Sequence, residues 1–200
     1  YEIVSGVLNG YTTGMPLCII IPNENVRSGD YDINQGLARP SHADYVAHVK
    51  YDGFEDYRGG GHFSGRLTAA IVAAGAICLD ALKKKNILIG THILRIGNTQ
   101  DVEFSDIENE IKLVNEKDFP VISDCHKAMI DEIFKVKMDN DSIGGIIQTA
   151  ICNLPIGLGE PWFDSIEGVI SNALFSIGGI KGIEFGAGFK FADLVGSTAN

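Results

Sequence analysis

The sequence predicts a single α/β or α+β domain over residues 1–200. Strand-like apolar runs and helix-like amphipathic runs alternate along the chain and are separated by tight turn signals. A length of 200 residues suits one domain, and 45% hydrophobic with 21% charged residues is an ordinary globular balance. No internal repeat or low-complexity linker divides the chain. These observations favour one compact core that mixes helices and strands.

Five apolar runs predict strands. Each is short, rich in isoleucine, leucine or valine, and bounded by glycine, proline or asparagine. The turn-like "GYTTGMP" separates the first two runs, and the fifth ends in a cluster of glycines. The predicted strands cover residues 2–9, 17–22, 86–97, 142–154 and 179–189.

Five segments predict helices. The strongest is 64–85, where alanines and aliphatic side chains cover nearly every face, so we expect this helix to be buried between layers. Ser41 is the expected N-cap of a helix over 42–51, with Asp44 three residues on. The other predicted helices are 106–114, 126–139 and 165–177.

Charge and cysteine content narrow the function classes. A net charge of −10 argues against a nucleic-acid partner, although one pocket of an acidic protein can still be positive. We expect the four cysteines to be buried free thiols in a reducing cytoplasm, because they show no CxxC pair and no zinc spacing. We also expect no signal peptide, no apolar span of membrane length and no membrane partner. The cysteines are Cys18, Cys78, Cys125 and Cys152.

The segment from Arg39 to Arg66 concentrates the chemistry. Guanidinium groups bind phosphate and carboxylate in a bidentate manner, so these two arginines are candidate anion ligands, or else surface salt bridges. "RGGGH", residues 58–62, is either a phosphate-cradling loop or a flexible entry to the next helix. His42 is a candidate proton donor that would gain charge when an anion binds, or a structural histidine. His48 and His62 are weaker candidates, and the three histidines lack the spacing of metal ligands.

Several motifs in order resemble the chorismate synthase family. The pattern "RPSHADY", "KY", "RGGGHFSGR" and "AAGAI" resembles the family signature, and "NLPIGLGEPWFD" and "LFSIGGIKGIEFGAGF" resemble segments that follow it. The resemblance covers essentially all 200 residues. It implies an α+β fold of the chorismate synthase type, a β-α-β sandwich with buried helices between antiparallel sheet layers.

The resemblance also implies an activity. The family converts 5-enolpyruvylshikimate-3-phosphate to chorismate by an anti-1,4-elimination of phosphate and requires reduced FMN. It implies a homotetramer and leaves open whether a separate flavin reductase is needed.

The resemblance assigns roles to individual positions. It makes His42 the catalytic proton donor and makes Arg39 and Arg66 substrate ligands. It also implies five cofactor contacts, which are His62, Phe63, Ser64, Gly178 and Gly179.

The sequence departs from the family pattern at several positions. His62 stands where the family has arginine, Phe63 where it has serine, Gly65 where it has alanine and Leu67 where it has glutamate; Gly178 replaces an asparagine. The family's Gly-Glu-Ser-His-Gly segment, the arginine-rich stretch after it and a C-terminal part are not among residues 1–200.

These departures leave more than one reading of the function. The leading expectation is a chorismate synthase core. The alternatives are a folded but inactive fragment or remnant, which would bind FMN weakly without turnover, and an unrelated phosphate-binding module.

Overall fold

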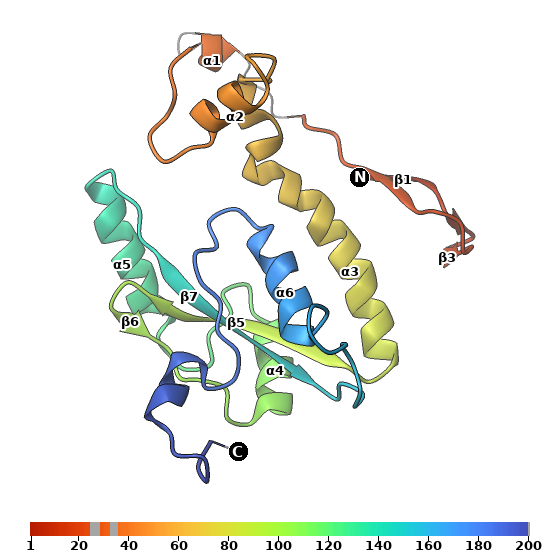
Figure 1. Cartoon of the computed structure of the whole chain (residues 1–200), viewed down its shortest axis with the longest axis vertical. Helices are drawn as coiled ribbons and strands as arrows, with labels where there is room; N and C mark the ends of the chain where they lie inside the picture. Colours follow the sequence, from red (N-terminus) through yellow and green to blue (C-terminus); the bar gives the residue numbers. More distant parts are fainter. Residues whose placement is uncertain (25–28, 33–35, 200) are drawn as a thin grey trace. The chain divides into compact units, whose positions relative to one another are not determined.

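A computed structural model describes residues 1–24, 29–32 and 36–199. It combines helices with short strands that pair only in antiparallel fashion, as the predicted α+β class requires (Figure 1). Contacts group the chain into two compact units, Tyr1–Gly75 with Gly159–Asn200, and Ala76–Leu158. The single-domain organisation stays a prediction.

Two small β-ribbons open the first unit. Strand β1 (Glu2–Ser5) pairs with β4 (Cys18–Ile20), and β2 (Val7–Leu8) pairs with β3 (Tyr11–Thr12). Gly6 joins the two ribbons at φ 85°, where a Cβ would lie 2.8 Å from the carbonyl oxygen of Pro16. Only glycine fits both that conformation and that contact. The predicted strands 2–9 and 17–22 are therefore confirmed, in shortened form.

Helices and turns make up the rest of the first unit. Ser165 caps α6, where its hydroxyl accepts a hydrogen bond from the backbone N–H of Gly168. The predicted N-cap at Ser41 is wrong: Ser41 lies at φ 58°, and α2 starts at Asp44 with no side-chain cap. The elements are α1 (Gly29–Asp32), α2 (Asp44–Lys50), the 3₁₀ helices η1 (Arg58–Phe63), η2 (Gly65–Leu67) and η3 (Gly188–Asp193), and α6 (Ile166–Phe175).

The predicted strand 179–189 is also wrong. Gly179, Gly186 and Gly188 adopt positive φ values of 91°, 58° and 55°. A strand needs extended backbone at negative φ, so three left-handed glycines in eleven positions break it into turns. The apolar residues between them gave a strand-like pattern that the backbone does not follow.

A three-stranded sheet forms the second unit, in the order β6-β5-β7. Strand β5 (Leu88–Ile96) pairs along its length with β7 (Gly145–Cys152), and its end turns back into the short β6 (Thr99–Gln100). The pairing shifts between Ile93 and Arg95, which marks a bulge or irregularity. The strands predicted over 86–97 and 142–154 are confirmed.

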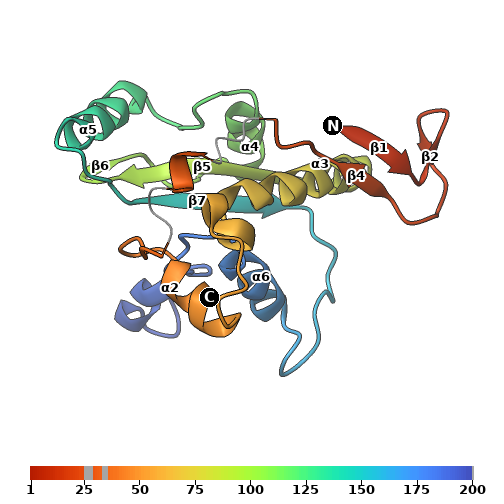
Figure 2. The same ribbon diagram turned by 90° about the horizontal axis from the view of Figure 1, so that it is seen from above.

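Helices α4 (Ile107–Asn115) and α5 (His126–Met138) pack on this sheet, on the same side of it in Figure 2. Their apolar stripes supply the core, with Ile111, Val114 and Met129 at most 2% exposed. Gly90 allows the close approach of α4, because a Cβ there would lie 2.9 Å from the Cα of Ile111. This is the best-packed region of the described chain.

The alanine-rich helix α3 (Thr68–Lys84) contributes residues to both units, and none of them is buried. This differs from the expected burial between layers, because an apolar helix is buried only where other layers cover it, and the described residues do not supply that cover. Gly65–Lys84 is long and apolar enough to span a membrane by length and composition alone, contrary to the sequence expectation. Core helices of water-soluble proteins meet the same criterion.

The four cysteines are free, but the expectation that they are buried is wrong. Cys18 and Cys78 are exposed, and Cys125 and Cys152 are intermediate. Cys18 lies in a two-stranded ribbon, and Cys78 lies on α3, which has no buried residue. No second layer of structure covers either side chain among the described residues.

Candidate functional site

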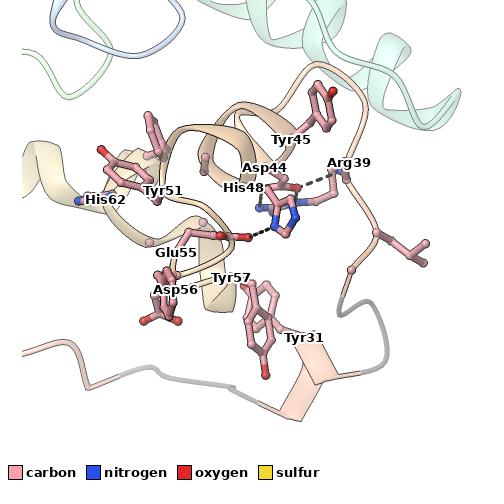
Figure 3. Close-up of a pocket in the computed structure, with 18 of the residues that line it drawn as sticks. Tyr31, Arg39, Asp44, Tyr45, His48, Tyr51, Glu55, Asp56, Tyr57 and His62 are labelled. Atoms are coloured by element: carbon pink, nitrogen blue, oxygen red, sulfur yellow. Dashed lines mark hydrogen bonds and ion pairs between the residues drawn. The ribbon is translucent and has the colours of Figure 1, made fainter.

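The first unit contains a cavity of about 660 Å³, within the size range of small-molecule sites. It is lined entirely by residues between Tyr31 and Leu67, the segment in which the sequence concentrates arginine, histidine and glycine (Figure 3). The charged and imidazole side chains of its wall are Arg39, Asp44, His48, Glu55, Asp56, His62 and Arg66.

Arg39 is held by Asp44. Its Nε donates to Asp44 Oδ2 at 2.8 Å, its Nη2 donates to Oδ1 at 2.9 Å, and its backbone N–H donates to Oδ2 at 3.0 Å. The hydrogen bonds from Arg39 are the main reason that the pKa of the Asp44 carboxyl lies well below its usual range. One face of the Arg39 fork is therefore already used within the protein.

His42 shares the same carboxylate. Its Nδ1 lies 2.6 Å from Asp44 Oδ1, and its side chain is 32% exposed. His42 does not itself line the cavity, whereas Asp44 and Gly60 do. A Cβ on Gly60 would lie 3.0 Å from His42 Cε1, so the imidazole stands directly behind the glycine turn.

The triple glycine is a packed turn. Gly59, Gly60 and Gly61 have φ values of 65°, 84° and 53°, a conformation that other residues adopt at a cost of about 1–2 kcal/mol each. Side chains there would also meet neighbours: the guanidinium of Arg66 at Gly59, His42 at Gly60, and the Asp56 carbonyl oxygen at Gly61. Glycine is therefore required at all three positions, because two side chains and one carbonyl oxygen lie close to the backbone of this turn.

Arg66 differs from Arg39. Its Nη1 donates to the carbonyl oxygen of Gly59 at 3.2 Å, and its backbone N–H donates to Ser64 Oγ at 3.4 Å. Among the described residues, no carboxylate lies within ion-pair distance of Arg66, although it lines the cavity. Arg66 is thus the cavity guanidinium with charge left for an anion.

A second imidazole–carboxylate pair lies at the end of α2. His48 Nδ1 donates to Glu55 Oε1 at 2.9 Å, and this bond is the main cause of a lowered pKa of Glu55 (Figure 3). Glu55 Oε2 is shielded from solvent and has no hydrogen-bond partner among the described residues. A buried acceptor without a partner is unusual and would be satisfied by a ligand that donates a hydrogen bond.

Aromatic rings form another part of the wall. The His62 ring packs against Tyr51 with centroids 5.2 Å apart and planes tilted by 38°, and it meets Phe63 edge-on at 5.4 Å. Ser64 does not line the cavity and instead caps η2. Gly178 and Gly179 do not line it either, and a Cβ on either glycine would have no atom within 4 Å. The structure therefore brings together His62, Phe63, Arg39 and Arg66 among the predicted site residues.

Sequence reasoning missed the carboxylates of this site. It treated Asp44 as part of a helix-capping pattern and gave Glu55 no role. The available signal was the spacing His42-Ala-Asp44, which places an acid two residues from a histidine. Four cavity tyrosines were also missed, which are Tyr31, Tyr45, Tyr51 and Tyr57.

This combination defines a class of protein. An α+β chain with a cavity of small-molecule size, a guanidinium available to an anion, two imidazole–carboxylate pairs and an aromatic wall is suited to bind a small anionic ligand and move a proton near it.

The chain belongs to the chorismate synthase family. The family model matches residues 1–200, and its description is chorismate synthase. The chorismate synthase of Thermococcus gammatolerans is 42% identical over 99% of this chain, and that of Korarchaeum cryptofilum is 43% identical over all of it. The chain spans 55% of the length of each of these relatives.

A solved structure supports the same family and fold. A crystal structure of chorismate synthase matches with a TM-score of 0.80 and 31% identity, and the match covers 98% of this chain and 58% of that one. The predicted fold class and family resemblance are thereby confirmed.

Proposed function

We propose that the whole protein containing residues 1–200 converts 5-enolpyruvylshikimate-3-phosphate to chorismate by an anti-1,4-elimination of phosphate that requires reduced FMN. The observation that supports this most strongly is the family match over every residue of the chain, including the cavity segment 39–66. The two relatives described above, of which this chain spans 55%, are chorismate synthases by name.

Arg66 is the proposed principal ligand of the substrate's anionic groups. It lines the cavity and keeps hydrogen-bond donors free, and a phosphate or carboxylate would accept from it. The proposed substrate role of Arg39 must use its remaining donors, because Nε and one hydrogen of Nη2 point at Asp44. We therefore expect Arg39 to act on the substrate mainly through its positive charge, because its guanidinium is not free for a bidentate contact.

His42 is the proposed proton donor. Its ring lies behind Gly60, which forms part of the cavity wall, and its carboxylate partner Asp44 lines the same cavity. Imidazole is the side chain that most often transfers a proton in general acid–base catalysis, and here its orientation is held by a carboxylate.

The residues present fit FMN in part. The ring wall of His62 and Phe63 suits a flat aromatic group, and the unpartnered Glu55 Oε2 would accept from a ligand hydroxyl. When bound, reduced FMN would lend an electron transiently to the substrate. The cofactor roles of Ser64, Gly178 and Gly179 remain proposals, as do the homotetramer, the separate flavin reductase and the cytoplasmic location.

An anaerobic assay of phosphate release and chorismate formation by the whole protein tests the proposal. Turnover should require reduced FMN, and equal turnover without flavin would overturn it. Arg66→Ala should weaken substrate binding by roughly 10–100-fold, the loss of about 1.5–3 kcal/mol from a charge-assisted hydrogen bond. Arg95→Ala is the matched control, because among the described residues the one hydrogen bond of that guanidinium is to the Gly97 carbonyl oxygen, in the other unit.

A flavin titration of residues 1–200 alone addresses the alternative of an inactive fragment. Submicromolar FMN binding with chorismate formed would exclude that alternative. Weak binding without turnover, in a chain that is folded by circular dichroism, would favour it.

A further inference from the structure

We propose that Asp44 is the positioning residue of His42: it fixes the imidazole as its Nδ1–H tautomer and leaves Nε2 as the nitrogen that exchanges protons with a ligand. The functional meaning of this inference rests on the proton-transfer role proposed for His42. The tautomer itself depends only on the contacts of His42 Nδ1 with Asp44 and Arg39.

The two neighbours of His42 Nδ1 make opposite demands. Asp44 Oδ1, an acceptor, lies at 2.6 Å, and Arg39 Nη2, a donor, lies at 3.2 Å. If Nδ1 accepted from Arg39, its lone pair would face an ionised carboxylate oxygen at the shorter distance. The shorter contact decides, because a hydrogen bond to a charged group at 2.6 Å is strong and two lone pairs at that distance repel.

The orientation of the Asp44 carboxylate is fixed by Arg39. Three hydrogen bonds from Arg39, two from the guanidinium and one from the backbone, fix both of its oxygens. These bonds also keep the carboxyl ionised, since they hold its pKa below the usual range. The carboxylate is thus a rigid acceptor, and it selects one of two otherwise available tautomers.

The opposite edge of the ring faces the glycine turn. A Cβ on Gly60 would lie 3.0 Å from His42 Cε1 and 3.5 Å from Nε2. No hydrogen-bond partner of Nε2 is found in the part of the chain that the structure describes. The proton that His42 gives or takes therefore moves at Nε2, on the side of a residue that lines the cavity.

Nitrogen-15 NMR of the imidazole groups tests this directly. In the unchanged chain, at a pH where His42 is neutral, Nδ1 should carry the hydrogen and Nε2 should not. The opposite pattern, or an even mixture, would overturn the proposal without any substitution. The chain has five histidines, so one His→Gln variant at a time assigns the signals.

Asp44→Ala should reverse the pattern. Without the carboxylate, the remaining neighbour of Nδ1 is the donor Arg39 Nη2 at 3.2 Å. A donor at that place requires an unprotonated Nδ1, so the hydrogen should move to Nε2. A folded Asp44→Ala chain in which Nδ1 keeps its hydrogen would show that Asp44 does not select the tautomer.

Two matched variants separate this effect from a general disturbance. Asp56→Asn removes a carboxylate that also pairs with an arginine, Arg58, but has no bond to an imidazole, so the His42 signals should not change. Glu55→Gln should alter the His48 signals and leave those of His42 unchanged. A change of the His42 tautomer in either variant would contradict the specific pairing.

Activity provides the second measurement. In the whole protein, Asp44→Ala should lower kcat by roughly 10-fold or more and change the pH dependence of kcat, with a smaller effect on KM. If the tautomer reverses while kcat and its pH profile are unchanged, the role of His42 in the proposed function fails and the structural assignment stands. If the tautomer does not reverse, the inference about Asp44 fails, and His42→Ala still tests the proposed function.

Discussion

Two histidine–aspartate pairs of this protein have the same chemistry and different surroundings. In the first unit, His42 and Asp44 are 2.6 Å apart, with side chains 32% and 21% exposed. In the second unit, His92 and Asp101 are 3.1 Å apart, and both side chains are fully buried. The first pair adjoins a cavity, and the second lies within the sheet core.

The difference lies in what the second imidazole nitrogen does. His92 Nε2 faces Gln148 Oε1 at 3.0 Å, and that oxygen also accepts from the backbone N–H of Phe104, which identifies it as the oxygen of the amide. Both nitrogens of His92 are therefore used by the protein. His42 Nε2 has no such partner among the described residues, so the first pair keeps a nitrogen for a ligand and the second serves the fold.

Asp101 also differs from Asp44 in its donors. Backbone N–H groups of Val102, Ile122 and Ser123 all donate to Asp101, at 2.9, 2.6 and 2.8 Å. Burial alone would raise the pKa of Asp101, but the hydrogen bonds outweigh it, and the net pKa lies well below the usual range. Asp101 joins two loops to the sheet, whereas Asp44 orients two side chains.

The largest expected effect is on stability in the second unit. Asp101→Asn places an amide NH₂ among buried donors, and the loss of such a buried charged partner costs about 3–5 kcal/mol. Asp44→Asn breaks a partly exposed pair and should cost about 1 kcal/mol or less. Urea denaturation of the two variants measures this directly. Equal losses would contradict the assignment of one pair to the fold and the other to the site.

Lowering the pH should test the structural role of Asp101 in a second way. The folded pKa of Asp101 lies below its unfolded value of about 3.9, so the stability it contributes is fully present above that pH. That stability is lost as the pH falls below about 4 towards the folded pKa. Denaturation midpoints should therefore fall as the pH is lowered below about 4, more steeply in the unchanged chain than in Asp101→Asn. Parallel pH profiles would rule out this role of Asp101.

The sequence predicted the regular elements well where periodicity and burial agree. Helices α4 and α5 bury apolar residues of their amphipathic patterns, Ile111 and Val114 in α4 and Met129 in α5. The apolar runs of β5 and β7 predicted the strands, although β7 buries none of its residues. It failed at 179–189, because apolar spacing does not report the positive φ of the intervening glycines.

The site was predicted by residue type but not by pairing. Arg39, His42 and Arg66 could be named from the sequence and the family resemblance. Asp44 binds the Arg39 guanidinium because the chain turns at Ser41, where φ is 58°. No local sequence pattern indicates that turn. The His92–Asp101 pair was missed because Asp101 reaches β5 only after the chain reverses through β6.

The last comparison concerns two glycines, Gly60 in a packed turn and Gly178 in an open one, and the smallest expected effect is at Gly178. Gly60 has φ 84° and would place a Cβ 3.0 Å from His42 Cε1, so Gly60→Ala combines backbone strain with displacement of the imidazole. We expect a loss of about 1–3 kcal/mol, because alanine is strained at positive φ and overpacking adds to the cost. Gly178 has neither a positive φ nor any atom within 4 Å of its Cβ position, so Gly178→Ala should stay within about 0.5 kcal/mol.

Thermal denaturation compares the two glycine variants, and the His42 nitrogen signals supply the second measurement. Gly60→Ala should shift those signals, since the ring must move, while Gly178→Ala should leave them unchanged. A Gly60→Ala chain with normal stability and unchanged His42 signals would show that the turn tolerates a side chain. The imidazole would then not be confined against the cavity wall, and the contrast between a ligand-facing histidine and a buried one would lose its geometric basis.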